Sequence, residues 1–362
     1  MKKFLTLVLA LSFVLTAAAC GSGSSSSSEA APDVSGSEGS SYAVNPAEVK
    51  VAIICETVGT ELFLTQVVDA ANAAKEKYGF ELSIMESSDA DAFLTNARAA
   101  VEEGYTLILG IGWRSADAIA MIATDYPDRA EYAIIDSTVE NDNVTCITFK
   151  EWEAAYVMGV FTASCFPEEN LFGYLDAFQT QKTYNYRWGF TQGVKSVNPE
   201  AEFIFTYTGS YTDPVKGKEL SLQMLSQGCK FIYGGAASSN EGIFALALER
   251  PGEVYSIGQD ADVTKEENPY VISSQLKNTG ECTTYVLDRY FAGTLEDGVS
   301  ILGLAEKAVG VVNVTADAIY RNTDIVTDEA IAAAQKAVDD ILSGAIVLEV
   351  PLEETSEEQP AA

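Results

Sequence analysis

Histidine is absent from the sequence, and basic residues are few. The 362 residues include 53 acidic and 22 basic side chains and no histidine, which gives a formal net charge of -31. Without histidine the chain has no Ser-His-Asp or Cys-His nucleophile system and no His-ligated zinc or iron. Without a basic surface it is a poor partner for nucleic-acid polymers, because such surfaces replace the counterions of the phosphates. These absences exclude several classes of enzyme and nucleic-acid binding.

Motifs for nucleotide phosphates and for metal clusters are also missing. No GxGxxG or GxxxxGK[ST] motif occurs, and Gly110 with Gly112 forms only an isolated GxG. No CxxC pair occurs, so neither a zinc cluster nor a redox dithiol is indicated. We expect no cofactor, no catalytic residue and no resident metal. We expect most of the cysteines after the N-terminal segment to be buried as small hydrophobic residues: Cys55, Cys146, Cys165, Cys229 and Cys282.

Long apolar runs are missing after the first twenty residues, so no finished transmembrane helix is predicted. Residues 1–20 carry Lys2 and Lys3, an apolar run and small residues before Cys20, which is typical of a secretory signal peptide. The cysteine after small residues resembles a bacterial lipobox, so lipidation of Cys20 is expected. The lipid would anchor the protein to the extracellular face of the cell membrane, or in the periplasm of a cell with two membranes. Residues 21–46 form a predicted Ser/Gly-rich tether, and residues 351–362 a predicted acidic tail.

Between these ends, apolar strands alternate with amphipathic helices. The hydrophobic fraction is 47%. Apolar and polar residues do not alternate along the strand segments, which are continuously apolar, as in parallel strands covered on both faces. The pattern predicts strands at 49–55, 80–85, 106–109, 132–135, 144–149, 171–175, 202–206, 229–233, 254–258, 270–274 and 346–350. It predicts helices at 63–78, 90–103, 116–123 (capped by Ser115), 151–165, 184–197, 215–226, 240–249, 280–291 and 328–343.

This alternation is typical of an α/β fold with doubly wound parallel sheets. Because the pattern restarts after the fifth strand, we expect two similar lobes with a binding cleft between them. We expect residues 47–148 and about 275–297 in the first lobe, and residues 149–274 and about 298–350 in the second. Each lobe is then discontinuous in sequence.

Candidate binding residues follow the predicted strands, where ligands of open α/β sheets bind. Aromatic side chains there can stack on a flat ligand, and carboxylates can accept hydrogen bonds from it. The candidates are Glu56, Trp113, Asp136, Phe178, Asn240, Asp260 and Lys277, with Phe63 on the first helix. Other interpretations stay open: Phe63 can be a core residue, Asp136 can cap a turn, and Lys277 can neutralise nearby acid. Asp260 and Asp262 are compatible with paired turn residues or a metal site.

The segment YTGSYTDPVKGKE at 207–219 resembles the basic membrane protein family of extracellular lipoproteins, the nucleoside-binding components of ABC importers. Further matching segments lie in order at 132–136 (YAIID), 149–159 (FKEWEAAYVMG), 187–194 (RWGFTQGV) and 256–262 (SIGQDAD). The resemblance covers about residues 49–293. It implies the two-lobed type I periplasmic-binding fold, with a purine nucleoside held between the lobes.

The resemblance also suggests roles for single residues. Phe63 and Tyr233 match stacking positions, and Asp136, Asp260 and Lys277 match polar contacts to the ligand. Three positions depart from the family pattern. Glu56 stands where an Asp is usual, Ile111 replaces an Asn that can contact the base, and Trp113 replaces a Phe.

The sequence therefore predicts a lipid-anchored, nonenzymatic receptor that binds a nucleoside and delivers it to an ABC permease. Alternatives remain at this point. The same fold serves receptors for sugars, amino acids or autoinducers, and the loss of the Asn at Ile111 favours such a ligand. A metal-dependent nucleoside hydrolase using Asp260 and Asp262, and a sensor that signals to a membrane kinase, are further hypotheses.

Overall fold

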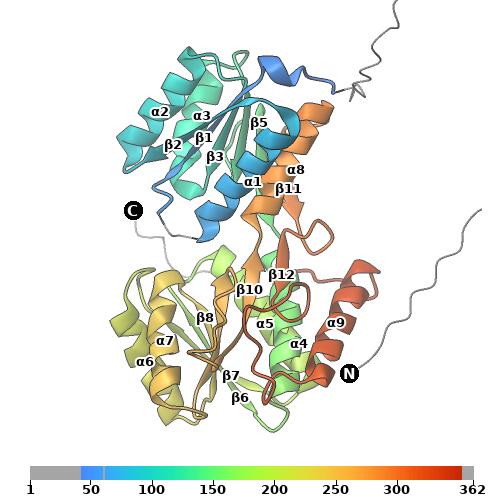
Figure 1. Ribbon diagram of the computed structural model, residues 1–362. Coiled ribbons are helices and arrows are strands. Elements are labelled where there is room, and N and C mark those ends of the chain that lie inside the picture. The colour runs from blue at the N-terminus through green and yellow to red at the C-terminus, as the bar shows by residue number, and fades with distance from the viewer. Residues whose placement is uncertain (1–41, 60–61, 353–362) are drawn as a thin grey trace, which may run out of the picture. The chain divides into compact units, whose positions relative to one another are not determined.

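The computed structural model describes residues 42–59 and 62–352 and shows two α/β lobes (Figure 1). The expected signal peptide, Cys20 and most of the tether lie outside the described residues, as does the acidic tail from residue 353 on. Residues 42–46, predicted as the last part of the tether, are described and make contacts with the first lobe. The Tyr42 ring contacts Tyr78 and Phe291, at centroid distances of 5.1 and 6.2 Å, and the Ala43 N–H donates to the Phe291 carbonyl.

The first lobe is built around a six-stranded sheet with the order β11-β5-β4-β3-β1-β2, in which the paired strands are parallel. Its strands are β1 (Lys50–Glu56), β2 (Glu81–Ser87), β3 (Leu107–Ile111), β4 (Glu131–Ile135), β5 (Val144–Phe149) and β11 (Gly298–Leu302). Its helices are α1 (Leu62–Tyr78), α2 (Ala90–Glu102), α3 (Ala116–Asp125) and α8 (Thr279–Ala292), with the short helices η1 (Pro46–Glu48) and η2 (Trp113–Ser115).

The second lobe repeats this plan around a sheet with the order β12-β10-β9-β8-β6-β7, where only the β10–β12 pair is antiparallel. Its strands are β6 (Leu171–Asp176), β7 (Glu202–Tyr207), β8 (Phe231–Gly235), β9 (Tyr255–Asp260), β10 (Val271–Lys277) and β12 (Val309–Val311). Its helices are α4 (Glu151–Cys165), α5 (Gln181–Val197), α6 (Pro214–Ser226), α7 (Glu241–Glu249) and α9 (Asp328–Leu342), with the short helix η3 (Ala237–Asn240).

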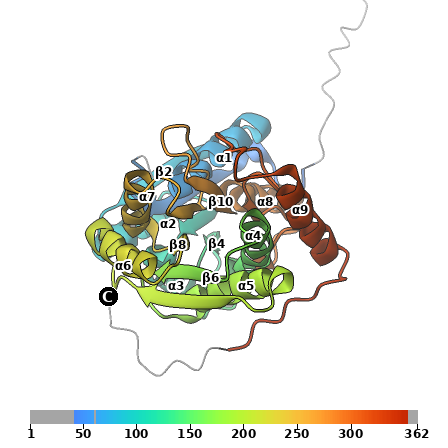
Figure 2. The same ribbon diagram turned by 90° about the horizontal axis from the view of Figure 1, so that it is seen from below.

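Helices cover both faces of each sheet, as the continuous apolar runs of the strands predicted. In the first lobe α1 and α8 share one apolar core with one sheet face, and α2 and α3 form another core with the opposite face. In the second lobe α6 and α7 lie on one side of the sheet and α4 and α5 on the other (Figure 2). The two-lobed, doubly wound α/β fold is confirmed.

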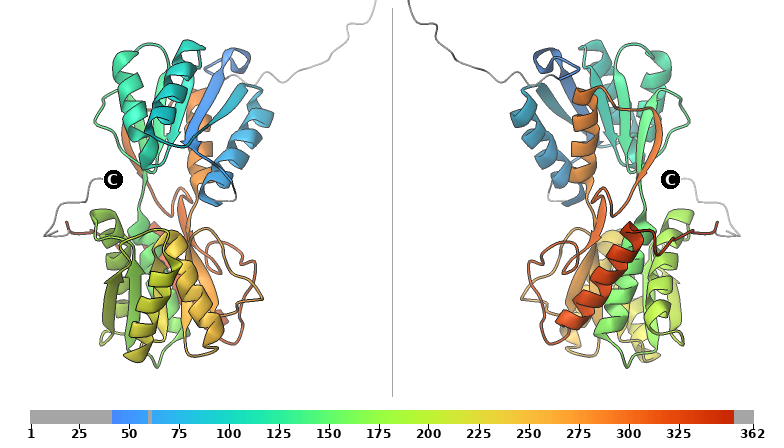
Figure 3. Two further views of the ribbon diagram at one scale, coloured as in Figure 1. Left: turned by 90° about the vertical axis from the view of Figure 1, so that its left-hand side faces the viewer. Right: turned by 90° about the vertical axis from the view of Figure 1, so that its right-hand side faces the viewer.

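The chain crosses between the lobes after β5, after β10 and after β11 (Figure 3). Strand membership differs from the predicted limits at about 275 and 298. β10 pairs in the second sheet through Lys277, and β11 at Gly298–Leu302 pairs in the first. The sequence pattern missed β11 because its side chains alternate between exposed and half-buried at the sheet edge, and it missed β12 because that strand has three residues.

Three local expectations were wrong. Residues 346–350 form no strand; they are extended, and alternate side chains pack against α4 and α5. α5 begins at Gln181, before the first apolar residue of its pattern, because Thr180 and Thr183 form a capping box there. Ser115 does not cap α3 with its side chain, since its hydroxyl donates to the Gly112 carbonyl at 2.8 Å.

The cysteines are thiols in the described part of the chain, and Cys55, Cys146, Cys229 and Cys282 are buried as expected. Burial raises the pKa of the Cys55 thiol to about 12. These thiols are therefore protonated at neutral pH and serve as small core residues.

The contact between α4 and α5 depends on glycine. A Cβ on Gly193 would lie 2.0 Å from the Tyr156 carbonyl oxygen, and a Cβ on Gly159 would lie 2.3 Å from the Phe190 carbonyl oxygen. Both neighbours are helix backbone, which cannot move aside without separating the helices. The glycines therefore set the distance between α4 and α5, and with it the position of the side chains that α5 carries.

We expect Gly193→Ala to lower the free energy of unfolding by about 3 kcal/mol, because an added methyl group forces overpacking at this contact. Urea unfolding followed by circular dichroism measures the change. Gln192→Ala, at an exposed neighbouring position on α5, is the control and should change stability by less than about 0.5 kcal/mol. Equal stability of the two variants would show that the helix contact is looser than described.

Candidate functional site

Polar residues gather where the parallel strands of both sheets end. Asp136 follows β4, while Asp260 and Lys277 are the last residues of β9 and β10. Asp136 and Asp260 have φ angles of 67° and 69°, in the left-handed region that non-glycine residues rarely adopt. Such local strain persists only where the surrounding structure enforces it, and it is frequent at binding sites.

Asp136 joins the two lobes through ion pairs. Its Oδ1 atom lies 2.7 Å from the Lys182 Nζ and 3.2 Å from the Lys277 Nζ, and both lysines belong to the second lobe. Burial alone would raise the pKa of Asp136, but the two ammonium groups outweigh burial and the pKa is lowered. Asp136 is therefore ionised at neutral pH.

Lys277 is only 5% exposed and is surrounded by aromatic and acidic groups. Its Nζ lies 5.2 Å from the ring centroid of Phe149 and 5.8 Å from that of Tyr186. Burial would lower the pKa of Lys277, yet nearby carboxylates, Asp136 first among them, raise it well above its ordinary value. The side chain is thus a fixed cation, held by cation–π contacts and by charge.

Asp260, near Asp136 and Lys277, has a carboxylate oxygen that accepts no hydrogen bond from the part of the chain that the structure describes. Its Oδ1 atom is buried and accepts no hydrogen bond from the described residues. Burial raises its pKa, Lys277 and Lys182 oppose the rise, and Asp136 adds to it. A buried acceptor without a donor is destabilising, so Asp260 is suited to accept a hydrogen bond from a bound molecule.

Glu151 and Tyr186 lie beside these charged residues. We call the whole set the junction cluster: Asp136, Glu151, Lys182, Tyr186, Asp260 and Lys277. Glu151 is 4% exposed, and burial raises its pKa although Lys277 and Lys182 lower it. Glu151, Lys182 and Tyr186 were not among the predicted site residues, because they lie on helices and do not follow strands. Lys182 did carry a signal, since a cation in the first turn of a helix opposes the helix dipole.

Asp262 does not belong to the junction cluster. Its two carboxylate oxygens accept the backbone N–H groups of Thr264, at 2.8 Å, and Ile319, at 2.6 Å. The side chain therefore fixes a loop. Throughout residues 42–59 and 62–352 no group of three or more acidic, cysteine or histidine residues could hold a metal ion.

The predicted aromatic residues of the first lobe lie near the ends of β1 and β3. Phe63 is half-buried in the first turn of α1, and its carbonyl accepts a hydrogen bond from Thr279. Trp113 is 59% exposed in η2, with the Arg114 guanidinium 5.2 Å from its ring. The Arg114 Nε also pairs with Glu56 at 3.2 Å. Ile111, two residues before Trp113, is buried in β3.

The predicted residues of the second lobe divide into two kinds. Phe178 is partly exposed after β6 and makes an edge contact with Tyr211, at a centroid distance of 5.3 Å. Tyr233 is fully buried within β8, stacks on Tyr174 at 4.6 Å and donates its hydroxyl to Gln275. Asn240 is 3% exposed, and its side chain bonds to the backbone of its own loop at Gly234 and Ala236. The structure brings together Asp136, Asp260 and Lys277, whereas the side chains of Tyr233 and Asn240 are engaged within the protein.

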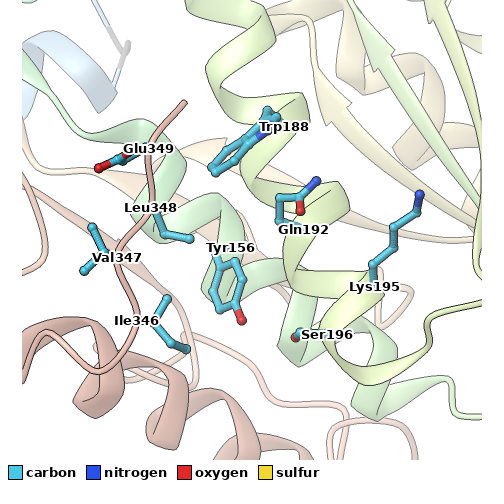
Figure 4. A pocket seen from close by; sticks show the side chains of 9 residues that line it. All are labelled: Tyr156, Trp188, Gln192, Lys195, Ser196, Ile346, Val347, Leu348 and Glu349. Carbon is cyan, nitrogen blue, oxygen red and sulfur yellow. The ribbon is translucent and has the colours of Figure 1, made fainter. Parts of the chain in front are cut away.

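A groove of about 700 Å³ lies elsewhere in the second lobe, between α4, α5 and residues 346–349 (Figure 4). Leu348 points toward Tyr156 and the helices, while Val347 and Glu349 point away. No residue of the junction cluster lines this groove. In the described residues, no helix has both the length and the apolar character needed to cross a bilayer.

Known proteins resemble the chain over most of its length. A family model described as "ABC transporter substrate-binding protein PnrA-like" matches residues 49–350. The ABC transporter nucleoside-binding protein BmpA of Lactococcus lactis is 27% identical over 289 residues, covering 75% of this chain and 79% of its own. The CD4+ T-cell-stimulating antigen of Listeria monocytogenes is 31% identical over 243 residues, which cover 63% of this chain and 67% of the antigen.

Solved structures share the fold. A solute-binding protein of an ABC transporter from Aeropyrum pernix superposes with a TM-score of 0.68 at 22% identity, covering 84% of this chain and 94% of its own. With the family model matching nearly all of both lobes, the chain belongs to the PnrA-like, or basic membrane protein, family of ABC transporter substrate-binding proteins.

Proposed function

We propose that this protein captures a neutral nucleoside between its lobes, outside the cell, and delivers it to an ABC permease. The observation that carries the proposal is the buried, unpartnered acceptor of Asp260 beside the Asp136–lysine pairs. Hydroxyl and N–H groups of a nucleoside are the donors that such an acceptor needs. The name of the Lactococcus lactis relative, a nucleoside-binding protein, supports this ligand class.

The charges of the junction cluster favour a neutral ligand. Three carboxyl groups, Asp136, Glu151 and Asp260, accompany two lysines, and both lysines contact Asp136. A phosphate would find no free cation among these residues and would be repelled by the carboxylates. A nucleoside is therefore favoured over a nucleotide.

The remaining predicted side chains fit the rest of such a ligand. Phe63, Trp113 and Phe178 lie near the strand ends of the two sheets. Trp113 is 59% exposed, so its ring is accessible for stacking on a base in addition to its contact with Arg114. Ile111 offers no hydrogen bond to the base, so we expect weak discrimination among purines. Lipidation of Cys20 would keep the receptor on the extracellular face of the cell membrane, near its permease.

Delivery requires a change that the permease can sense. A ligand that contacts Asp136 on the first lobe and Asp260 on the second stabilises the arrangement in which both lobes reach it. Lobe closure around the ligand is the hinge motion that such a two-lobed protein supports. No bond of the ligand is made or broken in this process.

We expect inosine, guanosine or adenosine to raise the melting temperature of the purified full-length chain. At 100 times its dissociation constant a ligand stabilises the native state by about 2.7 kcal/mol. A thermal-shift screen with nucleosides, free bases, pentoses and amino acids, followed by calorimetry, measures the effect. Shifts with pentoses or amino acids and none with nucleosides would reject the nucleoside and favour another small solute.

Asp260→Asn is expected to raise stability and weaken nucleoside binding at least tenfold. Burial raises the pKa of Asp260, so its ionised form destabilises the fold at neutral pH, and asparagine removes that charge. Binding weakens because a charged acceptor is replaced by a neutral amide. Asp262→Asn is the matched control: it should lower stability, because Asp262 accepts two backbone N–H groups, and leave affinity unchanged. The reverse pattern would assign ligand binding to Asp262.

Nucleoside affinity should fall as the pH is lowered from neutrality toward the range in which ordinary carboxyl groups titrate. The pKa of Asp260 is raised, so protonation of this group begins above the pH at which ordinary carboxyl groups titrate and competes with the ligand donor. Asp136, whose pKa is lowered, remains ionised in this range. Calorimetry at several pH values measures how the nucleoside affinity changes with pH. Burial also raises the pKa of Asp176 to about 7, so the difference between wild type and Asp260→Asn isolates the part due to Asp260.

A further inference from the structure

Tyr186 is a buried tyrosine of the junction cluster without an assigned role. It lies on α5, is 4% exposed, and its ring centroid is 5.8 Å from the Lys277 Nζ. The glycine contacts between α4 and α5 hold this helix at a fixed distance from α4. The position of the Tyr186 ring is therefore set by the fold rather than by a flexible loop.

The hydroxyl of Tyr186 makes no hydrogen bond within the described residues, and its oxygen is not among the fully buried polar atoms that lack a partner, so it keeps access to the space outside the chain. The buried tyrosines of this chain differ in this respect: Tyr174, 1% exposed, has a buried hydroxyl without a partner in the described part of the chain, whereas two others have one. Tyr132 donates to the Tyr126 carbonyl at 2.7 Å, and Tyr233 donates to Gln275. The Tyr186 hydroxyl is thus a polar group whose partner is supplied from outside the chain.

The charges around Tyr186 keep its hydroxyl protonated. Burial raises the pKa of the phenol, Lys277 opposes the rise, and Asp260, Glu151 and Asp136 add to it. A protonated phenol is a hydrogen-bond donor. It therefore offers a donor among the same groups that include the unpartnered Oδ1 acceptor of Asp260.

An unused donor and an unused acceptor in one site call for a ligand group that both accepts and donates. A sugar hydroxyl does so, since it has one O–H donor and two acceptor lone pairs. The edge of a purine base can also donate and accept, but it does so through two different atoms. A hydroxyl is the group of a nucleoside in which one oxygen does both, so it is the group that can bridge Tyr186 and Asp260 through a single atom.

We propose that Tyr186 is a specificity-determining residue, which donates a hydrogen bond to a ribose hydroxyl whose own proton is donated to Asp260 Oδ1. The inference rests on the proposed nucleoside function and extends it from the ligand class to one chemical group. A deoxynucleoside that lacks this hydroxyl leaves both protein groups unpartnered. The site then distinguishes ribonucleosides from one of their deoxy analogues.

The test compares Tyr186→Phe with the wild-type full-length chain by calorimetry. The ligands are the tightest-binding nucleoside of inosine, guanosine and adenosine, and its 2′-deoxy and 3′-deoxy forms. The wild type should bind one deoxy form at least tenfold more weakly than the ribonucleoside. Tyr186→Phe should bind the ribonucleoside about tenfold more weakly than the wild type does, and should bind that deoxy form with wild-type affinity.

Tyr132→Phe is the matched control, because it removes a buried tyrosine hydroxyl from the first lobe that already has a partner. It should lower the melting temperature and leave all affinities unchanged. Tyr186→Phe should keep or raise the melting temperature of the ligand-free chain, because no hydrogen bond within the protein is lost. This comparison separates a loss of ligand contact from a loss of fold.

Two results would overturn the inference and leave the nucleoside function intact. One is an unchanged ribonucleoside affinity in Tyr186→Phe, and the other is an equal loss for the ribonucleoside and both deoxy forms. If the wild type binds no nucleoside, the proposed function itself fails and the inference fails with it. The two failures are therefore distinguished by the wild-type titration alone.

Discussion

The structure depends on one electrostatic arrangement, in which the buried Lys277 and the half-exposed Lys182 share a single oxygen of Asp136. A lone charge at such depth would be strongly destabilising, and a fixed cation such as Lys277 is tolerated only because carboxylates and aromatic rings surround it. Asp136 belongs to the first lobe and both lysines to the second. These charges therefore connect the lobes, and Asp260 beside them presents the acceptor that the described residues leave unused.

The fold explains how residues so distant in sequence meet. Parallel strands of one sheet end at a common edge, so Asp260 and Lys277 lie together as the last residues of β9 and β10. Helices α4 and α5 bring Glu151, Lys182 and Tyr186 to the same place, and the close packing through Gly159 and Gly193 fixes the distance between the two helices. A rigid scaffold of this kind lets a small number of polar groups select a ligand.

The sequence predicted the sheets well, because buried parallel strands are recognisable as continuous apolar runs. It missed β11, whose edge position exposes alternate side chains, and it mistook residues 346–350 for a strand because extended packing on helices has the same pattern. Asp136, Asp260 and Lys277 were found from their places at strand ends. Glu151 and Tyr186 were not, because the direction of a helical side chain depends on how helices pack. Lys182 was not found either, although its unfavourable position in the first turn of α5 was a local signal.

The most direct test of this account is a crystal structure of the chain with its tightest-binding nucleoside. We expect the sugar to lie in the junction cluster, within hydrogen-bond distance of Asp260, with Asp136 on the opposite lobe and both lobes in contact with the ligand. A nucleoside bound away from the junction cluster, for example in the groove beside residues 346–349, would contradict the central role given to these buried charges.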